Sequence, residues 1–185
     1  MQEIIEYIKQ AFDLKSQKCY KQAIEMLYKA LEIESDNMEI LFQLGELYFL
    51  LNNFQRSMQY LEKVLENNPN HVEALKLIQK IYKYTNEKEN AAKIAEKIYQ
   101  IQKNQDNIIN LINALSASCN MSKISELEAL NSENDDVIYH IAKAFYDNGK
   151  IQEAKEKLEK ILEINSKNEN ALVLLGKIYF EENEF

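Results

Sequence analysis

Side chains with catalytic or metal-binding chemistry are few in this sequence and do not cluster. Cys19 and Cys119 lie 100 positions apart, and the only histidines, His71 and His140, also stand alone. Metal sites and redox pairs instead show ligands at short, regular spacing. The sequence therefore predicts no metal site and no cofactor, and it favours two cysteines that act as small apolar side chains.

Enzyme signatures are equally absent from the sequence. Three glycines in 185 residues form no glycine-rich phosphate loop, and neither a His-Glu-x-x-His motif nor a nucleophile elbow occurs. The acidic run at residues 134–136 lacks the spacing and the glycine of a calcium-binding loop. We interpret it as a solvated, helix-capping loop and expect a protein without catalytic activity.

Lysines that share one helix face are the remaining polar feature. Lys76, Lys80 and Lys83 are spaced four and three residues apart, which puts them on one side of a helix. Lys143 and Lys177 recur 34 positions apart. Beside aromatic residues, such lysines would favour an acidic, aromatic-containing segment of a partner. The alternative is that the lysines are solvated and the aromatic rings pack between helices.

The overall charge limits the class of partner. The formal net charge is −8 and the isoelectric point is about 5.0. Nucleic acids and anionic membranes bind basic surfaces, so we expect neither as a partner. The N-terminus is already amphipathic and has no basic region or long apolar run, which predicts no signal peptide, no membrane span and a cytoplasmic location.

The elements that must position these residues are amphipathic helices. The first carries apolar side chains at Ile4, Tyr7, Ile8, Ala11 and Leu14, a spacing of three or four residues. One proline and three glycines leave little room for β-turns. We therefore expect an all-α fold.

Short polar clusters rich in asparagine separate the helices. Asparagine caps the exposed N–H groups of a helix and tolerates left-handed backbone. Asn70 followed by Glu73 resembles a capping box. Connections this short force neighbouring helices to run antiparallel, so each unit is predicted to be a helical hairpin.

A fixed period organises these hairpins. A Leu-Gly-x-x-Tyr motif begins at Leu44 and again at Leu175. Its first glycine, Gly45, lies 34 positions after Ala11, and its second lies 34 positions after Ala142. A small residue in this slot lets the two helices of a hairpin approach closely. A period of this size is typical of a helical repeat.

In these features the chain resembles the tetratricopeptide repeat family. The best match is residues 38–71, which end beside Pro69 but carry Ser57 where the family has alanine and Leu61 where it has an aromatic residue. The resemblance covers residues 1–185 as a single array. Its repeats are expected at about 4–37, 38–71, 72–105, 106–134, 135–168 and a partial 169–185.

Two places depart from the regular array. From Asn113 to Ala142 is 29 positions instead of 34, so the repeat at 106–134 is short, and it is either a hinge or a drifted repeat. After Tyr179 the last repeat has no second helix to cover Leu172 and Leu175. This predicts the N-terminal fragment of a longer protein, and the uncapped end could also drive self-association.

The resemblance implies a fold and a function. The fold is an all-α α-solenoid, a right-handed superhelix of antiparallel helix-turn-helix hairpins. The function is a non-catalytic protein–protein interaction scaffold that holds a peptide or helix of another protein in its concave groove. The alternative is the regulatory or targeting region of a larger enzyme. By position within the repeat, the residues expected to line the groove are Phe12, Phe42, Phe49, Lys76, Lys80, Lys83, Tyr84, Tyr139, Lys143, Tyr146 and Lys177.

Overall fold

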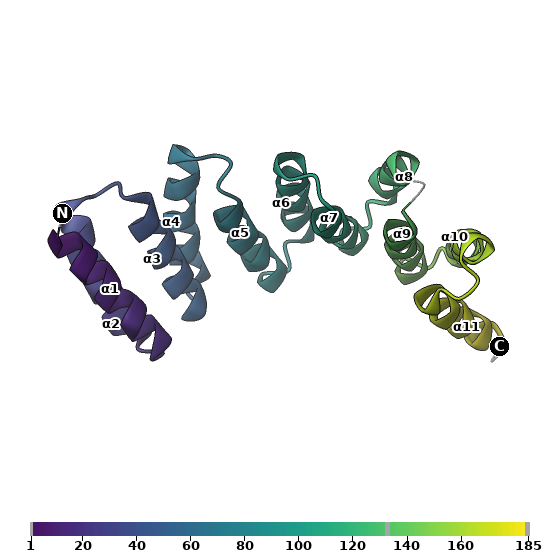
Figure 1. Cartoon of the computed structure of the whole chain (residues 1–185), viewed down its shortest axis with the longest axis horizontal. Helices are drawn as coiled ribbons and strands as arrows, with labels where there is room; N and C mark the ends of the chain where they lie inside the picture. The colour runs from purple at the N-terminus through teal and green to yellow at the C-terminus, as the bar shows by residue number, and fades with distance from the viewer. Residues whose placement is uncertain (1, 132–133, 184–185) are drawn as a thin grey trace. The chain divides into compact units, whose positions relative to one another are not determined.

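The structure is a computed structural model that describes residues 2–131 and 134–183. Within these ranges it contains eleven α-helices and no strand (Figure 1). The helices are α1 (Gln2–Ser16), α2 (Tyr20–Ile33), α3 (Met38–Leu50), α4 (Phe54–Asn67), α5 (Val72–Tyr84), α6 (Lys88–Ile101), α7 (Gln105–Ala117), α8 (Met121–Leu130), α9 (Asp135–Asp147), α10 (Ile151–Ile164) and α11 (Glu169–Asn183). The predicted all-α fold of the α-solenoid class is confirmed. None of the helices in the described ranges combines the length and the apolarity needed to cross a lipid bilayer.

Asparagine side chains begin many of these helices, as the sequence predicted. Asn37 accepts hydrogen bonds from the backbone N–H groups of Glu39 and Ile40, and Asn53 accepts one from Arg56. The prediction of a capping box at Asn70 is wrong. The N-cap of α5 is His71, whose Nδ1 accepts the N–H of Ala74 at 3.1 Å.

The turn inside each hairpin has one residue in the left-handed region. These residues have φ between 56° and 75° and recur about once per repeat, at Lys18, Asn52, Asn86, Cys119 and Gly149. Left-handed backbone reverses the chain tightly after a helix and favours glycine or asparagine. The hairpin turns are therefore built alike although their side chains differ.

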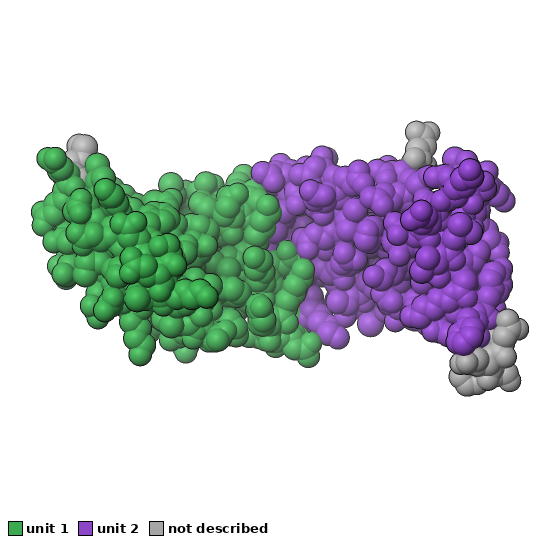
Figure 2. Space-filling view, turned by 60° about the horizontal axis from the view of Figure 1, so that its bottom comes forward, with its two compact units in different colours: residues 1–87 green, residues 88–185 purple. Residues whose placement is uncertain are grey.

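The chain divides into two compact units, residues 1–87 and 88–185 (Figure 2). The division falls between α5 and α6, which belong to one expected repeat, 72–105. The short repeat at 106–134 lies wholly within the second unit. The single continuous array stays a prediction.

In the first unit, α1 packs on α2 and α3 packs on α4. Gly45 of α3 allows a close approach, because a Cβ added there would lie 2.9 Å from two side-chain atoms of Leu61 on α4. Ser57, which replaces the alanine of the family pattern, is fully buried and donates a hydrogen bond to the Gly45 carbonyl at 2.7 Å. Its hydroxyl thus has a partner where it would otherwise be costly to bury.

In the second unit, α9 packs on α10, and α7 packs directly on α9. The helix between them, α8, is short, as the sequence predicted, and buries Ile124 alone among its residues. One apolar core runs through this unit, and it includes Ile112, Ile141 and Leu158. The weak burial of α8 agrees with the missing five residues of this repeat.

Candidate functional site

The residues expected to line a groove all lie on the first helices of hairpins, but they divide between the two units. Unit 1 contains seven of them, on α1, α3 and α5: Phe12, Phe42, Phe49, Lys76, Lys80, Lys83 and Tyr84. Unit 2 contains four, on α9 and α11: Tyr139, Lys143, Tyr146 and Lys177. Each unit therefore presents its own candidate surface.

The sharpest feature of unit 1 is a cluster of three rings, Phe49, Phe54 and Tyr84, which we call the aromatic cluster. The centroids of Phe49 and Tyr84 lie 5.7 Å apart in an edge-on arrangement. Phe54 lies 5.8 Å from Phe49 and is stacked on Tyr84 at 5.7 Å. Tyr84 is nonetheless 69% exposed. The structure thus brings together two of the expected residues from successive hairpins, Phe49 half-buried and Tyr84 exposed.

Sequence reasoning missed Phe54. It is the first residue of α4, a second helix, and the family pattern assigns groove positions to first helices. Its position directly after the turn could have indicated that its ring lies near the end of α3. Phe54 follows the short turn after α3, so its ring can reach back to the end of that helix.

Two other expected aromatic residues have separate partners. Phe42 packs on the ring of His71, with centroids 5.1 Å apart. Phe12 lies 5.9 Å from the ammonium of Lys15, which also pairs with Glu46 at 2.7 Å. These contacts tie the first helices of unit 1 to their neighbours.

The three lysines of α5 are exposed, as expected for one solvent-facing side. Partial burial of the ammonium lowers the pKa of Lys83, and the charge of Lys80 adds to that effect. Tyr84 lies four residues after Lys80, one turn further along the same face. Positive charge and an aromatic ring therefore adjoin on α5.

In unit 2, the expected residues Tyr146 and Lys177 meet across α9 and α11. The Tyr146 hydroxyl donates to the Glu181 carboxylate at 2.7–2.8 Å, and the Lys177 ammonium lies 4.9 Å from the Tyr146 ring centre. The interaction with Tyr146, followed by the charges of Glu181 and Asp147, raises the pKa of Lys177. Lys177 therefore stays charged, but Glu181 at 3.9 Å offsets part of its field.

Lys143 lies elsewhere in unit 2, at a pocket of about 430 Å³. The side chain of Asn148 donates to the Ser116 hydroxyl at 2.9 Å and so fixes one wall. Its lining includes two lysines and one aspartate, and this net positive charge suits an anionic group. The polar lining residues are Lys88, Asn113, Ser116, Lys143, Asp147 and Asn148.

Tyr139 is half-buried, and its place in a binding surface stays a prediction. Its ring packs against the apolar core of unit 2 and lies edge-on to His140 at 5.4 Å. His140 buries its Nδ1 without a hydrogen-bond partner among the described residues. Burial lowers the pKa of His140, although Asp136 opposes that shift. His140 is therefore neutral at pH 7 and adds no charge.

Comparisons with known proteins agree with this architecture. Two tetratricopeptide repeat models match residues 14–81 and 136–167, together more than half of the chain. The crystal structure of YrrB, a TPR protein with an unusual peptide-binding site, aligns over 91% of this chain and 89% of its own with a TM-score of 0.61 at 17% identity. MamA residues 41-end from Desulfovibrio magneticus RS-1 aligns over 91% of this chain and 98% of its own, with a TM-score of 0.67 at 17% identity. A search of curated protein sequences finds no match. At these identities the structural likeness concerns the fold.

Proposed function

Because the chain belongs to the tetratricopeptide repeat family, we propose that it is a non-catalytic scaffold that binds a peptide or helix of a partner protein. The proposed binding surface is formed by the first helices of its hairpins. The peptide-binding site named for YrrB supports this use of the same fold.

The aromatic cluster is the observation that carries the proposal. Three rings from three helices meet at one place, and the outermost is mostly exposed. Aromatic rings bury a large apolar area when a ligand covers them, and they lose little conformational entropy because few bonds rotate. Such clusters are typical of the residues that dominate the affinity of an interface.

Charge sets the expected chemistry of the partner. Lys76 and Lys80 lie on the same helix as Tyr84, so a segment covering the ring would meet positive charge. On the second unit, Lys143 lies in a pocket that also offers amide and hydroxyl groups to a carboxylate. We therefore propose that the partner segment is acidic and carries an aromatic or other large apolar side chain.

The test is a peptide-array screen with acidic, aromatic-containing sequences, followed by titration of the best peptide in solution. Tyr84→Ala should weaken binding roughly fivefold to tenfold at every salt concentration, because it removes apolar contact. Lys80→Glu should weaken binding at low salt, and its effect should fade as added salt screens the charge. Leu130→Ala and Lys63→Glu are matched controls, since both residues are exposed on second helices.

Binding that is unchanged in both Tyr84→Ala and Lys80→Glu would overturn the proposed surface. A preference for basic peptides would overturn the proposed partner chemistry. The controls should bind like the parent, so a loss in all four variants would point to a general defect of folding, which circular dichroism would detect.

A further inference from the structure

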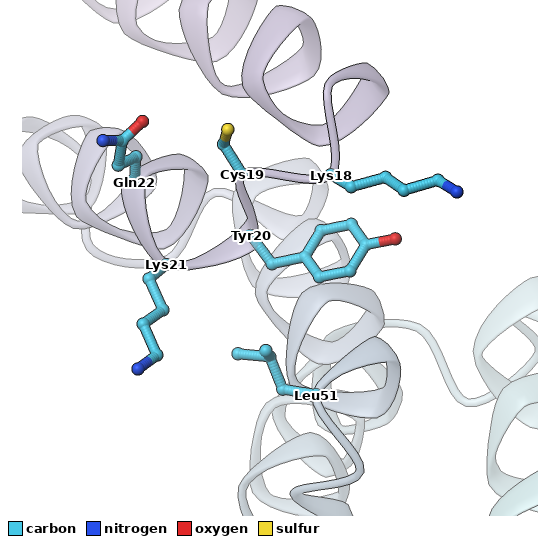
Figure 3. Close-up of a pocket in the computed structure, with 6 residues that line it drawn as sticks. All are labelled: Lys18, Cys19, Tyr20, Lys21, Gln22 and Leu51. Carbon is cyan, nitrogen blue, oxygen red and sulfur yellow. The ribbon is translucent and has the colours of Figure 1, made fainter.

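A second surface on unit 1 lies at the turn between α1 and α2, apart from the residues proposed for the groove. A pocket of about 380 Å³ opens there against the C-terminal end of α3. Figure 3 shows the Tyr20 ring between the side chains of Lys18 and Leu51, with Lys21 on the other side of the turn. The lining residues are Lys18, Cys19, Tyr20, Lys21, Gln22 and Leu51.

The middle of this pocket is apolar. Leu51 lines it and is 37% exposed. The ring of Tyr20 supplies a second apolar wall. An apolar side chain seated between Leu51 and the Tyr20 ring would remove apolar surface of both from water, which favours binding.

The turn that forms the pocket is held in place before any ligand arrives. The backbone N–H of Cys19 donates to the Leu14 carbonyl at 2.9 Å, and that of Lys18 donates to the Lys15 carbonyl at 3.0 Å. Lys18 itself has the left-handed φ of 61° that closes the hairpin. A preformed pocket saves the ordering cost that weakens binding to mobile loops.

The charge around the pocket is positive, in contrast to the chain as a whole. Lys18 and Lys21 line it, and no carboxylate does. Neither lysine forms an ion pair within the part of the chain that the structure describes. The pocket therefore offers two cationic groups around an apolar centre on a protein of net charge −8.

We propose that this pocket is a second protein-binding site, which seats one large apolar side chain of a partner segment whose flanking residues are Asp or Glu. The apolar side chain would cover Leu51 and Tyr20, and the carboxylates would pair with Lys18 and Lys21. Nucleic acid fits less well, because it requires an extended basic stripe and this site has two lysines. The site shares no residue with the aromatic cluster, so it does not depend on the function proposed above.

The experiment uses the full chain and a blocked peptide of sequence Glu-Asp-Leu-Asp-Glu. Amide chemical shifts in nitrogen-15 NMR locate the binding. We expect saturable shifts at residues 19–22 and at Leu51. Replacing the peptide leucine with alanine, or its acidic residues with lysine, should abolish them. The double variant Lys18→Glu, Lys21→Glu should bind about tenfold more weakly at low salt, because reversal turns two attractions into repulsions.

Matched variants separate this site from general effects. Leu51→Ser should weaken binding, whereas Ile33→Ser, at the far end of α2 and also exposed, should not. Reversal of Lys103 and Lys167, two exposed lysines of unit 2, should leave affinity unchanged. The proposal is overturned if no saturable shifts occur at residues 19–22 and Leu51, even where shifts occur at Phe49 and Tyr84, or if the reversed and parent chains bind equally. Tighter binding of single-stranded DNA or phosphatidylserine vesicles at residues 19–22 would also overturn it.

Discussion

At the scale of single residues, the three glycines have different roles. Gly45 leaves room for Leu61, since an added Cβ would lie 2.9 Å from it. Gly149 has φ of 75° in the turn between α9 and α10, with open space around it. Gly176 occupies the same repeat slot as Gly45, yet an added Cβ would meet no atom within 4 Å among the described residues. The close approach expected at Gly45 is present, and the open space at Gly176 agrees with the prediction that the last repeat lacks a second helix.

These surroundings give opposite predictions for two identical substitutions. Gly45→Ala should lower the free energy of unfolding by about 1–3 kcal/mol, because the methyl group forces Leu61 to move, and Gly45→Leu should cost more. Gly176→Ala should raise it by up to about 1 kcal/mol, because alanine favours a helix interior and the position is exposed. Urea unfolding followed by circular dichroism measures both. Equal stability of parent and Gly45→Ala would contradict the packing described here.

At the scale of elements, a network of hydroxyl groups joins α2 to the hairpin of α3 and α4. The Tyr28 hydroxyl lies 2.8 Å from that of Tyr48 and 2.9 Å from that of Tyr60. The rings of Tyr48 and Tyr60 stack at 5.7 Å, and Arg56 donates to the Tyr48 hydroxyl at 2.9 Å. Burial raises the pKa of Tyr28 and of Tyr48. These hydroxyls therefore stay protonated at pH 7 and can donate as well as accept.

Tyr28→Phe removes the central hydroxyl of this network. We expect it to lower the free energy of unfolding by about 1–2 kcal/mol, because two hydrogen bonds are lost while Tyr48 keeps Arg56 and Tyr60 keeps access to water. Tyr84→Phe is the control, since Tyr84 is exposed and should change stability by a few tenths of a kcal/mol at most, roughly. An equal effect of the two substitutions would show that the network adds no stability.

At the scale of the whole molecule, each of the two compact units has an apolar core among its described residues. One contains residues of α1 to α3, and the other extends from α6 to α11. The division between compact units falls between Glu87 and Lys88, which are both exposed. Units with their own cores can unfold separately.

This arrangement predicts that a destabilising substitution in one unit unfolds that unit alone. Gly45→Leu should unfold residues 1–87 at a temperature at which residues 88–185 keep their amide NMR signals. Leu158→Ala creates a cavity at a fully buried position of α10. It should unfold residues 88–185 at a temperature at which residues 1–87 keep their amide NMR signals. Simultaneous loss of the signals of both units in either variant would instead show one cooperative structure.

The helices and their turns were readable in the sequence because their signals are local. Apolar spacing of three or four residues fixes which face of a helix is buried, and asparagines between such stretches mark where helices begin. The short α8 and the close approach at Gly45 followed from the same repeat period. The prediction failed locally at Asn70, where the neighbouring His71 supplies the cap.

Only the tertiary structure decided which side chains from different helices meet. Phe54 joins Phe49 and Tyr84, Ser57 finds the Gly45 carbonyl, and Glu181 pairs with Tyr146. Each contact depends on how far one helix is rotated and shifted against another. Many packing interactions together determine that rotation and shift. A periodic sequence pattern predicts which face of a helix is buried. It does not predict how two helices align or where the chain divides into two units.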